Sequence, residues 1–164
     1  MIRKIYFDAC IFIAYFHEKH TNHLEVKECL EAIKNIDLEC YSSFWSINEM
    51  VKVLVRECKY RKQDAEKYAK KIYEENSLGS IKINWVGVGD SEKYSFQDFF
   101  DHITLMLINS KEDLHLADAI HSIIMINNEI DTILTTNGNH FRGLKDFIPI
   151  EPKMICAILG KKKK

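Results

Sequence analysis

Three acidic side chains lie in apolar stretches of the sequence, where a carboxylate is costly unless its charge is compensated. Asp8 ends the apolar run at residues 5–7, Glu49 lies in the amphipathic stretch at residues 44–58, and Asp118 is flanked by Ala117 and Ala119. Carboxylates that converge repel one another and raise one another's pKa. A hard divalent ion with oxygen ligands, Mg²⁺ or Mn²⁺, removes that penalty. Metal-dependent hydrolysis of a phosphodiester is the chemistry that such a site performs.

Each acid also has a purely structural interpretation. Asp8 stands where a helix would begin, and because Asp is a common N-cap, capping and functional roles both stay open for it. A single Glu in a partly buried helix, such as Glu49, lies more often on the solvent-exposed face. Asp118 gives the strongest signal, because its helix is predicted to be largely buried and a buried charge needs a partner.

The elements that must position these acids alternate between strands and helices. The apolar pattern predicts strands at residues 2–7, 39–42, 81–88, 132–135 and 147–150. It predicts helices at residues 11–34 (in two parts), 44–58, 62–77, 96–108 and 114–127. Asn22, with Glu25 three residues later, is a predicted capping box for the second part of the first helical region, and Ser43 is a predicted N-cap of the next helix.

This alternation predicts an α/β fold, a three-layer α/β/α sandwich with a mainly parallel central sheet. Functional groups of such sheets collect at the carboxyl ends of the strands. That rule selects Asp8 after the first strand, and Thr135, Thr136 and Asn137 at the end of a late one.

Composition limits the function classes. With 164 residues and 46% hydrophobic residues, the chain is expected to form one domain over residues 1–160, followed by a basic tail, Lys161–Lys164. A net charge of −1 means that nucleic-acid binding must be argued from local clusters. The five cysteines form no C-x-x-C pair, and neither a signal peptide nor a membrane-length apolar run is visible, so we expect a cytoplasmic protein with no membrane contact.

Four segments carry a family resemblance: KIYFDACIFIAYF (4–16), SSFWSINEMVKVL (42–54), LHLADAIHSIIM (114–125) and TILTTNGNHF (132–141). In this order and spacing they resemble the PIN domain, the ribonuclease fold of VapC-type toxins and of several RNA-processing nucleases. The resemblance covers nearly the whole chain.

The resemblance implies that Asp8, Glu49 and Asp118 occupy the three acidic metal-site positions, for Mg²⁺ or Mn²⁺. Asn137 stands at a fourth catalytic position that is often Asp, and its amide adds no negative charge. The hydroxyls of Ser43 and Thr136 are expected to orient the carboxylates or a water molecule.

The implied activity is that of an endoribonuclease acting on RNA, either the toxin of a toxin–antitoxin pair, with an antitoxin protein as partner, or an RNA-processing enzyme. A homodimer is expected because dimers are common in the family. The alternative is a catalytically weak PIN-like module that binds RNA or protein without cutting. A haloacid-dehalogenase-like phosphatase or a receiver domain would also carry an Asp after its first strand, but Cys10 stands where the phosphatase needs a second Asp.

A basic stretch follows Glu49 directly. Residues 52–71 hold eight basic residues against three acidic ones, with Tyr60 and Tyr68 interleaved. We expect the basic side chains to contact RNA phosphates and the two tyrosines to stack on bases, although a solvated helical face gives the same pattern. The residues predicted to bind RNA are Lys52, Arg56, Lys59, Arg61 and Lys62.

Histidines recur at helical spacing in two places. His17, His20 and His23 are three residues apart, as are His115, Asp118 and His121. Zinc ligation is conceivable for such spacing. For His121 the sequence favours ordinary packing in the core, with a phosphate contact near Asp118 as the alternative.

Overall fold

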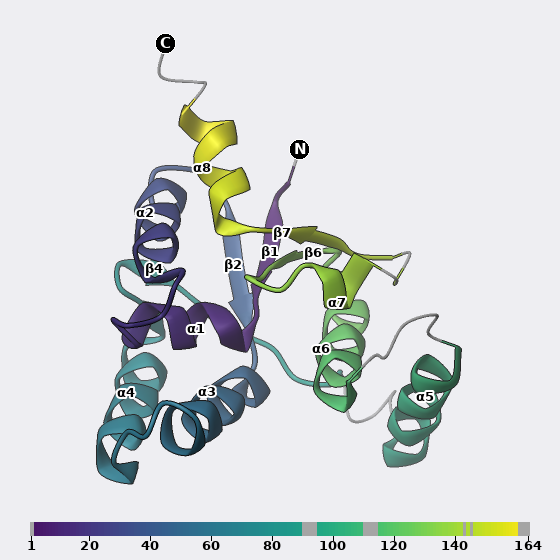
Figure 1. Ribbon diagram of the computed structural model, residues 1–164. Coiled ribbons are helices and arrows are strands. Elements are labelled where there is room, and N and C mark those ends of the chain that lie inside the picture. The colour runs from purple at the N-terminus through teal and green to yellow at the C-terminus, as the bar shows by residue number, and fades with distance from the viewer. Residues whose placement is uncertain (1, 90–94, 110–114, 143, 145, 161–164) are drawn as a thin grey trace.

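The central element is a five-stranded parallel sheet in the order β5-β2-β1-β6-β7, seen in a computed structural model that describes residues 2–89, 95–109, 115–142, 144 and 146–160 (Figure 1). Its strands are β1 (Lys4–Phe7), β2 (Glu39–Ser42), β5 (Asn84–Trp85), β6 (Thr132–Leu134) and β7 (Ile148–Ile150). A separate antiparallel pair consists of β3 (Ser77–Leu78) and β4 (Ile81–Lys82). The predicted basic tail, Lys161–Lys164, lies outside the described residues.

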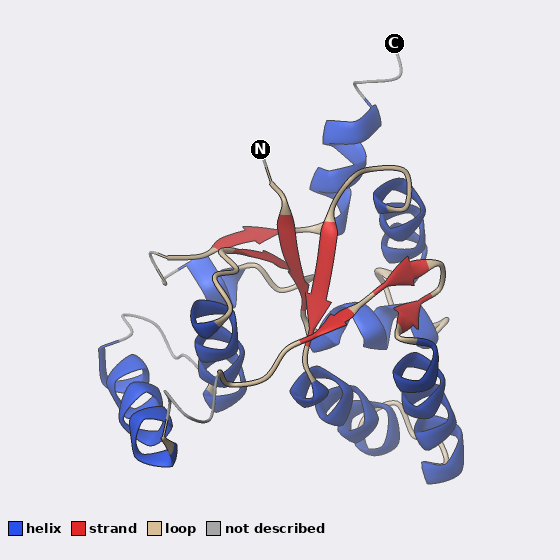
Figure 2. Ribbon diagram, turned by 180° about the vertical axis from the view of Figure 1, so that it is seen from behind, coloured by secondary structure: helices blue, strands red, loops and turns tan. Residues whose placement is uncertain are grey.

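Helices cover both faces of the sheet (Figure 2). They are α1 (Ala9–Phe16), α2 (His23–Ile33), α3 (Phe44–Arg56), α4 (Lys62–Glu75), α5 (Phe96–Asn109), α6 (Leu116–Asn127), α7 (Asn139–Arg142) and α8 (Pro152–Gly160). The predicted three-layer α/β/α architecture with a parallel sheet is therefore confirmed. Among the described residues, the helices are too short or too polar to cross a membrane.

Strand β1 is buried on both faces, which explains its uninterrupted apolar sequence. Ile5 and Phe7 point into a core formed with α1 to α4, whereas Tyr6 points into a second core formed with α6. The exposed fraction of all three side chains is 0%. Alternate residues of one strand thus tie the two helical layers together.

The carboxyl ends of three strands meet at one edge of the sheet. In the parallel register Tyr6 lies opposite Tyr41 of β2 and Phe7 lies opposite Leu134 of β6. The chain then leaves the sheet at Asp8, where the backbone N–H of Asp8 donates to the carbonyl of Leu134 at 3.1 Å. The residues that follow β1, β2 and β6 consequently emerge side by side.

The predicted strand over residues 81–88 is divided in the structure. Ile81 lies in the β3–β4 hairpin, whose turn contains Gly79 at φ +63°, and only Asn84–Trp85 joins the central sheet. Ile81 and Ile83 are both buried in the same core, so the alternation of buried residues is real although the segment is not one continuous strand.

Two features at the ends of helices differ from the sequence prediction. Asn22 precedes α2, but its side chain makes no capping hydrogen bond. Glu25 instead accepts a hydrogen bond from the backbone N–H of Lys153 at 2.9 Å, at the start of α8. Helix α8 was not predicted from the sequence. It begins at Pro152, and proline disfavours a helix at every position except those of the first turn.

Candidate metal centre

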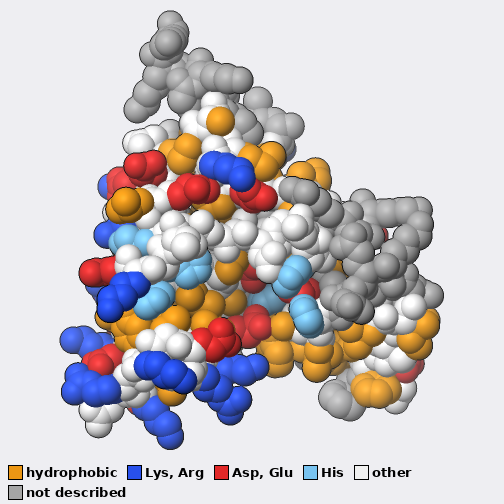
Figure 3. Space-filling view, in the orientation of Figure 1, with side chains coloured by type: hydrophobic (Ala, Val, Ile, Leu, Met, Phe, Trp, Pro, Cys, Tyr) orange, Lys and Arg blue, Asp and Glu red, His pale blue; other side chains and the backbone are white. Residues whose placement is uncertain are grey.

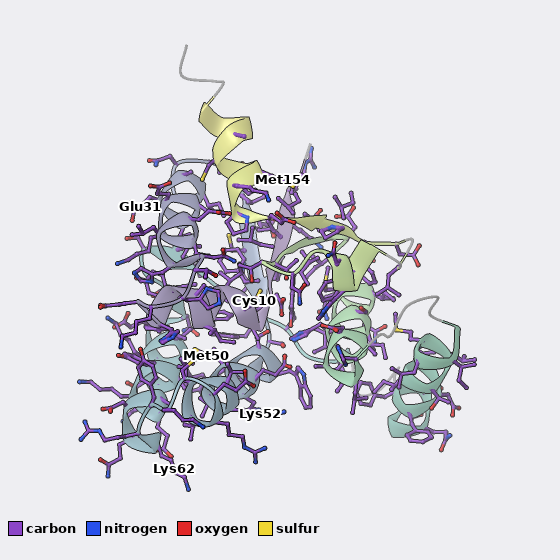
Figure 4. All side chains as sticks on the ribbon, in the orientation of Figure 1. Cys10, Glu31, Met50, Lys52, Lys62 and Met154 are labelled. Carbon is purple, nitrogen blue, oxygen red and sulfur yellow. The ribbon has the colours of Figure 1, made fainter. Side chains whose placement is uncertain are left out.

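Asp8 occupies the N-cap position of α1 without acting as an N-cap. Its backbone is extended, with φ −69° and ψ 157°, and its side chain makes no capping hydrogen bond. Its Oδ2 instead accepts a hydrogen bond from the hydroxyl of Thr135 at 2.7 Å and one from the thiol of Cys10 at 3.0 Å. Figure 4 places Cys10 at the start of α1, beside the carboxyl end of β1. One carboxylate oxygen is thereby fixed, and the other, Oδ1, is turned towards α6.

His121 of α6 lies between Asp8 and Glu49. Its exposed fraction is 1%, and its Nε2 lies 2.5 Å from Oε2 of Glu49 and 3.8 Å from Oδ1 of Asp8. One oxygen of each carboxylate and one nitrogen of the imidazole lie within 4.8 Å of one another. Metal–ligand bonds of about 2.0 to 2.4 Å separate ligands by up to roughly 4.8 Å across one ion. The three side chains therefore have the spacing of a divalent-metal site.

The charge of this group is partly balanced within the protein. Burial alone would lower the pKa of His121, but its hydrogen bond to Glu49 and the charges of Asp8 and Glu49 raise that pKa above its ordinary value. In the described part of the chain, no lysine or arginine forms an ion pair with Asp8, Glu49 or Asp118. The ion-pair partners of these carboxylates among the described residues are therefore the histidines His121 and His140.

Helix α3 delivers Glu49 to the group. Ser43 is the N-cap of this helix, as predicted, and its hydroxyl accepts from the backbone N–H of Ser46 at 3.4 Å. Ser46, Ile47 and Met50 form part of the buried face, and Glu49 lies beside it with a side chain that is 25% exposed. Glu49 is therefore half-buried and faces the sheet edge.

The Tyr6 hydroxyl links the layers behind the metal group. It lies 2.8 Å from Nδ1 of His121, 2.6 Å from the Ser43 hydroxyl and 3.2 Å from the Ser46 hydroxyl. Burial raises the pKa of Tyr6 well above its ordinary value, so the phenol stays neutral. Ser43 therefore reaches the metal group only through Tyr6 and His121.

Asp118 and Asn137 form a second cluster at the opening of the site, through His140. Nδ1 of His140 lies 3.1 Å from Oδ2 of Asp118, and the Asn137 side-chain amide lies 2.8 Å from Nε2 of the same ring. Burial raises the pKa of Asp118, His140 opposes that shift, and the nearby charge of Asp8 adds to it. Asp118 therefore lies close to Asp8, but its carboxylate contacts His140 instead of the three-ligand group.

Thr135, not Thr136, is the threonine whose hydroxyl contacts a carboxylate of the site. Thr135 also accepts from the backbone N–H of Asn137 at 3.0 Å. Thr136 contacts Cys10, whose sulfur accepts from the Thr136 backbone N–H at 3.1 Å. The strand-end rule had selected Thr135 together with Thr136, but the orienting hydroxyl was predicted at Thr136. The place of His121 between Asp8 and Glu49 was not predicted, although the i, i+3 spacing of Asp118 and His121 was visible.

The raised pKa of Asp118 predicts a pH-dependent gain of stability in Asp118→Asn. A carboxyl group whose folded-state pKa exceeds the ordinary 3.8 stabilises the fold below that value and loses this contribution as pH rises through the folded-state pKa. In EDTA, the free energy of unfolding of the variant should therefore rise relative to wild type between about pH 3 and pH 7. Urea unfolding at several pH values measures this, and a difference that is constant with pH would contradict it.

No protein-family model matches this chain, and no curated protein matches it. Several solved structures share its fold. One is VapC20 of Mycobacterium tuberculosis, described as a sarcin-ricin loop cleaving toxin, with 13% identity and a TM-score of 0.54 over 79% of this chain and 86% of that one.

Two further matches are chains of toxin–antitoxin complexes. VapBC2 of Rickettsia felis, bound to a DNA fragment of its promoter, matches with 12% identity and a TM-score of 0.61 over 90% of this chain and 98% of that one. A toxin–antitoxin complex of Klebsiella pneumoniae matches with 20% identity and a TM-score of 0.53 over 90% and 97%. At these identities the likeness concerns the fold: the chain has the PIN-domain fold of the VapC toxins.

Proposed function

We propose that this protein is a metal-dependent endoribonuclease and the toxin of a toxin–antitoxin pair. One observation carries the proposal: Asp8, Glu49 and His121 place ligand atoms within 4.8 Å of one another at the carboxyl edge of a PIN-type sheet. VapC20, which has this fold, is described as a sarcin-ricin loop cleaving toxin. The finer assignments, including the site residues predicted from the sequence, are part of this proposal.

Asp8 and Glu49 would hold one divalent ion, with Asp118 beside them. Such an ion, when bound, activates a water molecule and neutralises charge on the leaving oxygen. Thr135 and Cys10 hold Oδ2 of Asp8, so that Oδ1 stays directed into the site. This fixed geometry is the contribution of the protein, because a carboxylate that is already oriented loses little freedom when it binds an ion.

The exposed side of the site would receive the scissile phosphate. The Asn137 amide and the His140 ring lie there, and the His140 side chain is 36% exposed. Asn137 can orient the attacking water without adding negative charge near the phosphate. His140 can hold a proton at Nδ1, where Asp118 accepts it.

Basic side chains lead away from the site along α3. Lys52 and Arg56 follow Glu49 at spacings of three and seven residues, so they continue the same helical stripe. Together with Lys62 of α4 they line a groove of about 280 Å³. Figure 3 shows Lys and Arg side chains gathered over α3 and α4, next to acidic side chains near the centre of that face, and Figure 4 labels Lys52 and Lys62 there. We propose that this groove binds the RNA backbone.

Two of the basic residues predicted to bind RNA are engaged within the protein. Arg61 forms an ion pair with Asp64 at 2.7 Å, and the Lys59 ammonium donates to the carbonyl of Arg56 at 2.7 Å. Both side chains remain exposed and can contact RNA at the outer end of the groove. Lys52, Arg56 and Lys62 are accordingly the stronger candidates.

The double variant Lys52→Ala/Arg56→Ala should bind RNA more weakly and with less dependence on salt. Each lost phosphate contact to a single strand lowers the slope of log K against log salt by about 0.7, so we expect a change of about 1.4. Fluorescence anisotropy with labelled RNA at several salt concentrations, using Asp8→Asn protein to prevent cleavage, measures it. Lys27→Ala/Lys34→Ala on α2 serves as the control, and an equal change in both pairs would contradict the assignment.

The proposed function is tested by incubating the purified protein with RNA in Mg²⁺, Mn²⁺ or EDTA. We expect cleavage in the metal ions and none in EDTA, with products that carry a 5′-phosphate and a 3′-hydroxyl, because metal-activated water, not the ribose 2′-hydroxyl, is the nucleophile. RNA that is bound but uncut under all conditions would instead support the alternative, a module that binds without cutting.

A wide apolar groove beside the site is a candidate surface for the antitoxin. It measures about 610 Å³ and is lined by side chains that include Phe44, Trp45, Phe100, Ile103, Leu116 and Ile120. Similar folds occur in solved toxin–antitoxin complexes, which supports a protein partner here. We propose that an apolar antitoxin segment lies in this groove, next to the catalytic residues. Loss of RNA cleavage on co-purification with the product of the adjacent gene tests it.

The homodimer and the cytoplasmic location predicted from the sequence are kept as proposals. Helix α5 exposes Leu105 and Ile108, with exposed fractions of 54% and 72%, and these side chains are suited to an interface between two copies. Light scattering of the purified protein, with Ile108→Lys as the variant, distinguishes a dimer from a monomer.

A further inference from the structure

A hydrogen-bond network on one side of the His121 ring holds its Nδ1 atom. Nδ1 lies 2.8 Å from the Tyr6 hydroxyl, which has a single proton to give. The same hydroxyl lies 2.6 Å from the Ser43 hydroxyl, so the Tyr6 oxygen is held in place behind the ring. On the other side of the ring, Nε2 is hydrogen-bonded to Glu49. An ion that takes Nε2 as a ligand would replace the proton of that hydrogen bond, since metal binding to imidazole releases a proton.

The other side of the ring faces the two carboxylates. Nε2 lies 2.5 Å from Glu49 and 3.8 Å from Asp8, on the side of Asp8 that Thr135 and Cys10 leave free. The ring cannot turn away, because it is 1% exposed and its edge packs on Tyr6 with a centroid distance of 5.6 Å. An ion held between these oxygens of Asp8 and Glu49 would therefore lie within reach of Nε2.

We infer that Nε2 of His121 is a direct ligand of the ion, and that the site prefers first-row transition ions to Mg²⁺. The inference rests on the proposed function, because it concerns the same ion. It departs from the all-oxygen site implied by the sequence resemblance. The supporting geometry is a buried imidazole with Nδ1 hydrogen-bonded behind it and Nε2 among carboxylates, which is the usual arrangement of metal-bound histidine.

The nitrogen ligand changes which ions bind well. Mg²⁺ favours oxygen ligands and retains several water molecules in a near-ideal octahedron. Imidazole favours zinc, cobalt, nickel and iron, and at a given site affinity rises from Mn²⁺ through Co²⁺. We therefore expect Co²⁺ to bind more tightly than Mn²⁺, and Mn²⁺ to bind at least about tenfold more tightly than Mg²⁺.

Pulsed electron paramagnetic resonance of Mn²⁺ bound to the whole protein tests the ligand directly. We expect a ¹⁴N coupling from a directly bound nitrogen, together with the order Co²⁺, Mn²⁺, Mg²⁺ by isothermal titration calorimetry. His121→Gln should lose the coupling and at least about tenfold of the Mn²⁺ affinity. His115→Gln, an exposed histidine at the start of the same helix, should keep both.

The unmodified protein decides the question even if His121→Gln fails to fold. Mn²⁺ that binds without a ¹⁴N coupling, or that binds no better than Mg²⁺, would overturn the inference. The proposal that the protein cleaves RNA would not be affected by that result. A clear coupling in a protein that cuts no RNA would uphold the nitrogen ligand and refute the nuclease. Tyr6→Phe retains the ring packing but removes the hydrogen-bond partner of Nδ1, and it should weaken Mn²⁺ binding about tenfold without removing the coupling.

Discussion

Replacement of Asp8 by asparagine is expected to lower the rate of RNA cleavage by about 1,000-fold. A bound ion supplies several kcal/mol of transition-state stabilisation, and each 1.36 kcal/mol corresponds to a tenfold change in rate. The substitution removes the charge that holds the ion but preserves the shape of the side chain. The carbonyl of the new amide can still accept the hydrogen bond from Thr135, so the fold should be retained.

Asp101→Asn provides the matched control. Asp101 is exposed on α5, where it accepts a hydrogen bond from Gln97, and it lies outside the metal group. Cleavage of a labelled RNA by each purified variant in Mn²⁺ gives the rates, and circular dichroism checks the fold. An Asp8→Asn protein that is folded and retains wild-type activity would refute the proposed mechanism.

Thr135→Val should reduce the rate of RNA cleavage by about 10- to 100-fold, the usual cost of removing a group that orients a metal ligand. The Thr135 hydroxyl donates to Oδ2 of Asp8 at 2.7 Å and is fully buried. Valine has nearly the same shape, so the loss is of orientation, not of packing. The effect should appear partly as weaker Mn²⁺ binding, which calorimetry detects separately from the rate.

Two other threonines of the same segment test whether the effect on cleavage depends on the position of the lost hydroxyl group. Thr132 is buried at the opposite end of β6 and donates to Asp131 at 2.7 Å, and Thr136 contacts Cys10 through its backbone N–H. Neither Thr132→Val nor Thr136→Val should lower activity as far as Thr135→Val. Equal losses in all three variants would show that the effect is a general loss of stability.

The burial of two acids, Asp8 and Asp118, was predictable because their signals are local. A strand as apolar as residues 4–7 must be buried, so the acid that follows it, Asp8, had to lie at the edge of a sheet. Asp118, surrounded by small apolar residues, was likewise marked as a buried charge, and its exposed fraction is 8%. Both acids can be recognised from the residues beside them in the sequence, without knowing which helices and strands are neighbours in the fold.

The roles of His121 and Thr135 depend on contacts between distant parts of the chain. His121 takes its place only because Tyr6, 115 residues earlier, points into the same core. The choice between Thr135 and Thr136 depends on where β6 ends, since adjacent residues point to opposite faces and a shift of one residue exchanges them. Neither register nor strand neighbours can be read from periodicity alone.

The order of the strands has a consequence during protein synthesis. Strand β1 is made first, yet it lies between β2 and β6, and Asp8 receives its hydrogen bond from Thr135, 127 residues later. A nascent chain that ends before β6 contains Asp8 and Cys10 but lacks Thr135, and it also lacks His121 and Asp118 if it ends before α6. Because such long-range pairing must wait for its partner, incomplete translation products that end before β6 should be harmless to the cell's own RNA.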